Sequence, residues 1–80
     1  MSDNSGPMMV VFRVRSGRQV FVCRGRLVWE GGVAVAETEE AEDGFFPPDR
    51  VRLEESDLEL RHDDETGSDF YLYHGLIFVP

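Results

Sequence analysis

The sequence predicts a small all-β domain, an antiparallel barrel or sandwich of five to seven short strands with room for one short helix. Three observations support this prediction. Apolar and polar residues alternate with a period of two, turn-forming residues recur at short intervals, and only one segment could form an amphipathic helix. A chain of 80 residues can build one core only. We therefore assign residues 1–8 to a flexible tail and residues 9–80 to a single domain.

The first half of the chain carries the clearest strand patterns. Residues 10–15 alternate between apolar and mostly polar side chains, and residues 16–18 (Ser-Gly-Arg) predict a hairpin turn. The continuously apolar segment 20–23 predicts a central strand that is covered on both faces. Gly25 indicates either a tight turn or a bulge. A further turn and strand are expected over residues 31–36.

The second half leaves two interpretations open. Pro47-Pro48 stops regular pairing because proline has no backbone N–H to donate. Residues 48–60 fit either two short strands with a turn at Glu55-Ser56 or one acidic helix. The two-residue spacing of their apolar side chains favours the strands. Residues 70–79 then form a final pair of strands, or one strand broken at His74-Gly75.

The charges are distributed unevenly along the chain. All eight basic residues are arginine, which excludes a Walker A loop in this chain because that loop needs a lysine. Residues 1–29 contain five arginines and one acid, whereas residues 30–80 contain fifteen acids and three arginines. Within residues 37–69, fourteen of 33 side chains are acidic. Such a density costs stability through mutual repulsion unless hydration or a partner relieves it.

Two groups of residues suggest chemistry, and each has a simpler interpretation. Cys23 with His62 or His74 could form a thiolate and its base, but the apolar neighbours of Cys23 favour a buried, inert thiol. The acidic segment 63–69 could hold a hard cation such as calcium. It departs from the EF-hand pattern because Gly67 occupies an acidic position, so a hydrated turn is favoured. We predict no catalytic residue, no metal and no cofactor.

Arginines at two-residue spacing suggest a nucleic-acid-binding face. Arg13 with Arg15, and Arg24 with Arg26, would each lie on one face of a strand. A net charge of −8 repels a phosphate backbone, however. We therefore expect these arginines to pair with acids across the sheet or to serve a protein interface.

The segment GFFPPDRV at residues 44–51 resembles the closing stretch of SH3 domains. In that family a glycine, an aromatic, an apolar residue and a proline precede a tyrosine and a valine. Here Arg50 stands in the place of the tyrosine, and the match covers eight residues. The resemblance implies a small barrel and does not extend to a peptide-binding groove.

The acidic half of the chain contains the candidate binding surface. Carboxylates at alternate strand positions project from one face about 6.7 Å apart and would resemble a phosphate backbone. Nearby aromatic side chains would supply anchors that lose their water on binding. The predicted partner-binding residues are Glu37, Glu39, Glu40, Glu42, Asp43, Phe45, Phe46, Asp57, Glu59, Tyr71 and Tyr73.

These features predict a non-enzymatic acidic binding protein. It would engage a basic surface of a nucleic-acid-processing protein complex and inhibit or regulate it, without touching nucleic acid or a membrane. In size and charge, though in no motif, the chain resembles phage-encoded decoys that block restriction or CRISPR complexes. The alternative is a structural or scaffold β module that mediates protein–protein or homo-oligomer contacts. A solvated acidic shell explains the charge without any partner.

We expect the protein to lie in the cytoplasm of the cell or of an infected host. The single cysteine rules out an internal disulfide, and no apolar run approaches the ~20 residues of a membrane helix. Residues 1–7 lack the basic and apolar regions of a signal peptide.

Overall fold

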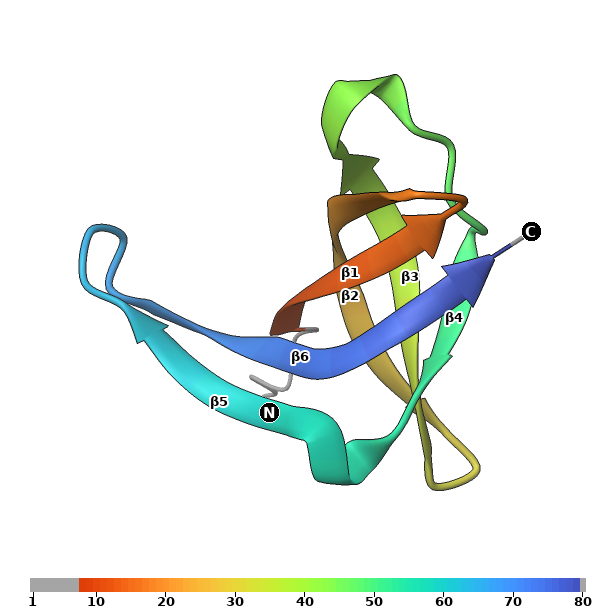
Figure 1. The fold of residues 1–80 in the computed structure, drawn as a ribbon. Coiled ribbons are helices and arrows are strands. Elements are labelled where there is room, and N and C mark those ends of the chain that lie inside the picture. Colours follow the sequence, from red (N-terminus) through yellow and green to blue (C-terminus); the bar gives the residue numbers. More distant parts are fainter. Residues whose placement is uncertain (1–7, 80) are drawn as a thin grey trace.

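The computed structural model describes residues 8–79, which form one six-stranded sheet with two short 3₁₀ helices (Figure 1). The prediction of a small all-β fold is confirmed. The elements are β1 (Met8–Ser16), β2 (Gln19–Glu30), β3 (Val33–Ala41), η1 (Glu42–Gly44), β4 (Arg50–Leu53), η2 (Glu55–Asp57), β5 (Leu58–Asp63) and β6 (Ser68–Val79). The predicted tail lies outside the described residues, except for Met8, which belongs to β1.

The strands lie in the spatial order β4-β3-β2-β1-β6-β5. Neighbouring strands are antiparallel except β1 and β6, which run parallel and so depart from the antiparallel prediction. This pair arises because the chain crosses from β4 through η2 and β5 to the other end of the sheet before β6 returns beside β1 (Figure 1). The Glu54 backbone N–H donates to the Tyr73 hydroxyl at 3.1 Å, which ties the crossing to β6.

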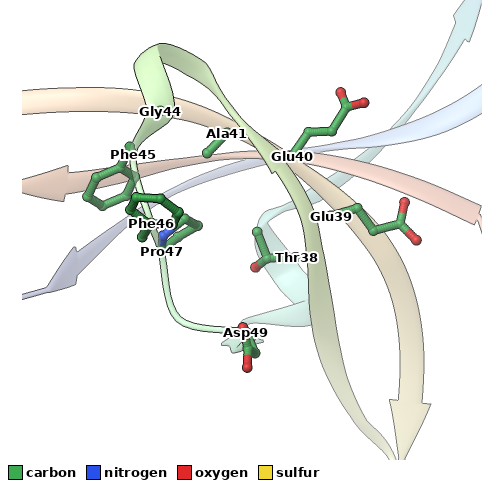
Figure 2. A pocket seen from close by; sticks show the side chains of 9 residues that line it. All are labelled: Thr38, Glu39, Glu40, Ala41, Gly44, Phe45, Phe46, Pro47 and Asp49. Carbon is green, nitrogen blue, oxygen red and sulfur yellow. The ribbon is translucent and has the colours of Figure 1, made fainter.

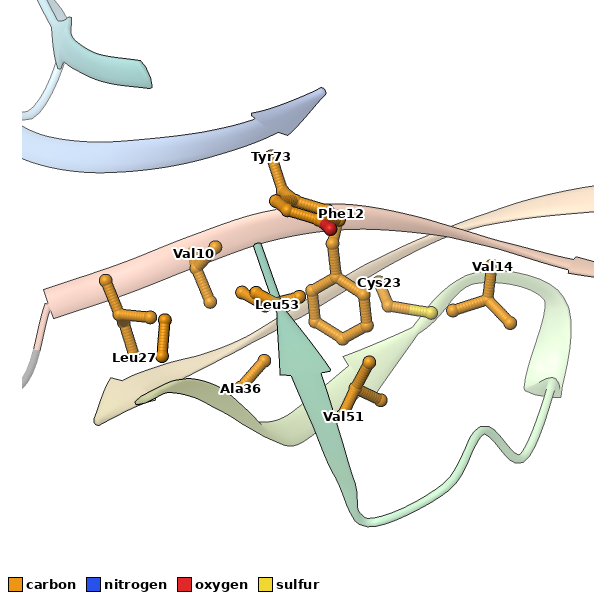
Figure 3. Close-up of a cluster of buried hydrophobic side chains, with 10 residues drawn as sticks. Val10, Phe12, Val14, Cys23, Leu27, Ala36, Val51, Leu53 and Tyr73 are labelled. Atoms are coloured by element: carbon orange, nitrogen blue, oxygen red, sulfur yellow. The ribbon is translucent and has the colours of Figure 1, made fainter. Parts of the chain in front are cut away.

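The core lies on the inner side of this curled sheet (Figure 3). Its buried side chains occupy alternate positions of each strand, as a period of two requires. They are Val10, Phe12, Val14, Cys23, Leu27, Ala34, Ala36, Val51, Leu53 and Tyr73. Five of the six strands therefore contribute to one core, and no described side chain with polar or charged character is buried in it except the phenol of Tyr73.

Both uncertain segments of the second half resolve as strands. Residues 48–60 form β4 and β5 with the single turn η2 between them, which confirms the two-strand interpretation. Residues 70–79 belong to one continuous strand that passes through His74-Gly75, so the predicted break there is wrong. The irregularity there is a register shift against β1, between Val11 and Arg13.

Gly25 lies at a β-bulge between β2 and β3. The pairing shifts from Arg24 with Glu40 to Gly25 with Thr38, which leaves Glu39 as the extra residue of β3. A Cβ at position 25 would lie 2.3 Å from the Glu37 carbonyl oxygen, so only glycine fits without a backbone shift. The bulge displaces Glu39 from the regular pairing just before β3 ends.

The prediction that the segment 20–23 is covered on both faces is wrong. Strand β2 is central in the sheet, but the side chains of Val20 and Val22 are 47% and 41% exposed. The described residues form a single sheet, with no second sheet to cover these valines.

Candidate functional site

The segment between β3 and β4 forms a loop over residues 42–49, which we call the Phe46 loop. It begins with η1, and Gly44 ends this turn with a φ of 68°, in the left-handed region that glycine tolerates. Two hydrogen bonds return the loop to β3. The Thr38 backbone N–H donates to the Asp49 carbonyl at 2.8 Å, and the Thr38 hydroxyl donates to the Pro48 carbonyl at 2.9 Å.

The two adjacent phenylalanines of the loop have opposite environments. Phe45 stacks on Phe21 of β2, with ring centroids 4.2 Å apart and planes 4° from parallel. The backbone at Phe45 is extended, with φ −65° and ψ 141°. Phe46, the next residue, is 93% exposed. The stacked ring fixes the loop, and the free ring is presented to solvent.

The Phe46 loop and the end of β3 enclose a hollow of about 490 Å³ (Figure 2). Its wall combines apolar rings with carboxylates. The lining residues are Thr38, Glu39, Glu40, Ala41, Gly44, Phe45, Phe46, Pro47 and Asp49. Glu39 and Asp49 are exposed, and within residues 8–79 neither carboxylate forms an ion pair.

Other acids of β3 are paired with arginines of β2. Glu37 bonds Arg26, with Oε1 and Nη2 2.7 Å apart, and Glu40 bonds Arg24. The hydrogen bond from Arg26 holds the pKa of Glu37 below its ordinary value of 4.5. The sequence expectation that Arg24 and Arg26 pair with acids across the sheet is confirmed. Glu37 and Glu40 are therefore partly neutralised by the chain itself.

The acids beyond β4 lie in another part of the molecule. Glu59 is on β5, at the opposite end of the strand order from β4. Its Oε1 lies 2.5 Å from His74 Nε2 and 3.6 Å from Arg61 Nη1, and the hydrogen bond from His74 lowers the pKa of Glu59. Asp57 is in η2, before β5. The structure therefore does not join Glu59 to the acids of β3 as one row.

The side chain of Glu42 bonds the backbone of β2. Strand β3 ends at Ala41 opposite Cys23, so β2 extends past it. Glu42 Oε1 accepts a hydrogen bond from the Val22 backbone N–H at 3.0 Å, which occupies this unpaired edge. The side chain of Asp43, which was also predicted to bind a partner, lies outside what the structure describes.

The two tyrosines do not form an exposed aromatic rim. Tyr73 is 5% exposed, and its hydroxyl accepts the hydrogen bond from Glu54. Tyr71 is half-buried against the core. Asp49 belongs to the site although it was not among the predicted residues. Its position after Pro48 gives no hint of this, because only the bonds from Thr38 bring it beside β3.

Cys23 and His62, which were considered for chemistry, are respectively buried and hydrogen-bonded within the fold. Cys23 is 1% exposed, and burial raises the pKa of its thiol, with a smaller contribution from Glu42. His62 Nδ1 lies 2.7 Å from Asp69, on the exposed β5–β6 hairpin. Among residues 8–79, no three His, Cys, Asp or Glu side chains are grouped to hold a metal ion. Over the same residues, no helix has the length and apolar character needed to cross a membrane.

Comparisons of the chain with protein-family models, with curated proteins and with solved structures found no match.

Proposed function

We propose that the protein is a non-enzymatic binding module whose Phe46 loop docks on a basic surface of another protein and regulates it. The observation that carries this proposal is the Phe46 ring, which is 93% exposed within an acidic loop. Single exposed apolar side chains are common on proteins. Phe46 differs because it lines a hollow that the exposed carboxylates of Glu39 and Asp49 also line.

The loop is suited to binding because it is already ordered. The Phe45 stack and the Thr38 bonds hold both of its ends, and Pro47 and Pro48 restrict the backbone between them. A rigid loop loses little conformational entropy when it docks. Burial of an aromatic ring then contributes about 25 cal/mol for each Å² of apolar area removed from water.

The charge of the protein supports a basic partner. A net charge of −8 steers a positively charged surface toward the protein, and this attraction accelerates association more than it tightens binding. Basic surfaces of this kind occur on proteins that process nucleic acids, which remain the proposed class of partner. Because Glu37 and Glu40 are paired with arginines, we place the contact on the Phe46 loop instead of on strand rows that imitate a phosphate backbone.

Affinity capture from the native host, or from the host of its virus if the protein is viral, tests this proposal. We expect Phe46→Ser to lose a partner that the wild-type protein retains. Leu60→Ser is the matched control, because Leu60 is 55% exposed on β5, away from the loop. It should capture the same partner as the wild type. Retention of all partners by the Phe46→Ser variant would contradict the proposal.

Salt and charge reversal test the electrostatic part separately. The captured complex should weaken with added salt because exposed charges are screened. Changing Glu39 and Asp49 to arginine should slow association, measured with the purified partner in a surface-binding assay. A complex that is indifferent to both changes would rule out a basic partner.

A further inference from the structure

The outer side of β2, β1 and β6 carries a patch that the described residues leave uncovered. The strand register arranges it as two rows. In the first row, Arg13 lies between Val22 of β2 and Leu76 of β6. In the second row, Arg15 lies between Val20 of β2 and Phe78 of β6. We call this patch the open face, and its residues are Arg13, Arg15, Val20, Val22, Leu76 and Phe78. Of its apolar members, Phe78 is 70% exposed, and the two valines are 47% and 41% exposed.

The open face is positively charged on a molecule that is otherwise acidic. Arg13 Nη2 donates to the His74 carbonyl at 3.1 Å, and Arg15 Nε donates to the Gly17 carbonyl at 3.0 Å. Neither guanidinium forms an ion pair with a carboxylate in the described part of the chain, unlike those of Arg24 and Arg26. The hydrogen bonds identify two acids beside the patch. Glu42 accepts from the Val22 backbone N–H, and Glu59 bonds the ring of His74, whose carbonyl accepts from Arg13.

This combination restricts what can cover the open face. Arginine and aromatic residues are enriched in protein interfaces, and the apolar members favour an apolar occupant. The two unpaired guanidinium groups require carboxylates, since a buried charge without a partner is costly. The occupant must therefore present an apolar side chain with acids beside it.

We propose that the open face receives the Phe46 loop of a second copy of this chain. The Phe46 loop and the end of β3 supply the required chemistry, an exposed ring with the exposed carboxylates of Glu39 and Asp49 around the same hollow. Phe46 packs among the apolar members, and the two carboxylates pair with Arg13 and Arg15. This inference rests on the proposed function of the loop and names a basic surface that it can bind.

Charge favours this head-to-tail contact over a symmetric one. A face-to-face dimer would bring the Arg13 and Arg15 side chains of both copies together, with no carboxylate in the patch to separate them. A head-to-tail contact joins opposite charges and leaves one loop and one open face free at its two ends. Such a heterologous contact continues into a chain of copies unless rotation closes it into a ring.

Sedimentation over a range of protein concentrations gives the first test. We expect the wild-type protein to increase in average mass with concentration from its monomer mass of 9.1 kDa. Arg15→Glu should remain monomeric. Arg52→Glu is the matched control, because it changes the net charge equally at an exposed position of β4 and should associate like the wild type. A urea titration shows that each variant is folded.

Mixing two variants gives the sharper test. Phe46→Ser retains its open face and Arg15→Glu retains its loop, so each alone should be monomeric. Because the mixture still contains one intact loop and one intact open face, it should form a one-to-one dimer that grows no further. A wild-type protein that stays monomeric at every concentration, or a mixture without dimer, would overturn the inference.

The two proposals fail in distinguishable ways. Arg15→Glu leaves the loop intact, so it should still capture the basic partner of the proposed function. If that capture persists while the wild-type protein is monomeric, self-association is excluded and the proposed function stands. If the copies associate while neither the wild-type protein nor Arg15→Glu captures another protein through Phe46, the loop serves self-association and the proposed function is excluded.

Discussion

Phe12 and Phe46 show how differently two regions of this molecule use the same side chain. Phe12 of β1 is completely buried in the core, whereas Phe46 of the loop is 93% exposed. Neighbouring residues show the same contrast among acids. Glu37 is held by Arg26, but Glu39, displaced by the bulge, forms no ion pair within residues 8–79. The local backbone, and not the residue type, therefore decides which side chains are available to a partner.

The largest effect on stability should come from a substitution at the buried ring, Phe12. Phe12→Ala removes a fully buried ring and leaves a cavity, so we expect a loss of about 3–5 kcal/mol in the free energy of unfolding. Chemical denaturation measures this loss. Phe78→Ala, at a ring that is 70% exposed, is the control and should cost far less. Equal losses would mean that the assigned core is incorrect.

The bulge that separates Glu37 from Glu39 should be the next most sensitive feature. Gly25→Ala places a Cβ 2.3 Å from a backbone oxygen, so the strands must shift, at a cost of roughly 1–3 kcal/mol. Gly75→Ala meets the ring of Tyr73 at 2.7 Å instead of backbone, and because that ring is buried and bonded to Glu54, we expect this variant to be destabilised as well. Thermal unfolding compares the two. A neutral Gly25→Ala would show that β2 and β3 pair differently.

Substitutions at the two phenylalanines of the loop should differ in their effect on stability, because only Phe45 packs against the rest of the protein. Phe45→Ala removes the stack on Phe21, and the aromatic contact alone is worth about 0.5–1.5 kcal/mol. Phe46→Ala should change stability by less than about 0.5 kcal/mol, because its ring contacts little of the protein. Denaturant midpoints of both variants test this order. A reversed order would mean that Phe46 is the ring that anchors the loop.

The smallest effect should come from the paired acid Glu37. Its pKa is lowered in the folded state, so its contribution to stability is present above about pH 4.5 and disappears as the pH falls through the lowered value. The stability difference between the wild-type protein and Glu37→Gln should therefore be larger at neutral pH than in acid. In an Arg26→Gln background the same comparison should show a smaller pH dependence. An unchanged pH dependence would exclude the ion pair as its source.

Much of the fold follows from the sequence because strand patterns are local. The alternation in β1, the turns and the division of residues 48–60 into two strands all depend on residues close together in the chain. The pairing of β1 with β6 does not, because it joins segments about sixty residues apart. The exposure of Val20 and Val22 was also inaccessible, since an apolar run does not reveal whether a second layer covers it.

The sequence predicted which residue types would form the candidate site, but it did not predict how their side chains are arranged. The acids and aromatics of residues 37–49 stand out in the sequence, and Phe46 does lie exposed among them. Pairing of Glu37 and Glu40 with β2, and burial of Tyr73 in the core, depend on the strand register.

The sequence by itself determined the strand content, the principal turns and the charge of this protein, because these depend on side-chain chemistry and local backbone preference. Only the tertiary structure decided which acids the chain neutralises, which ring stays in water and which sheet face remains open. These outcomes depend on register and curvature, and a shift of one residue in pairing would turn every side chain of a strand to the opposite face.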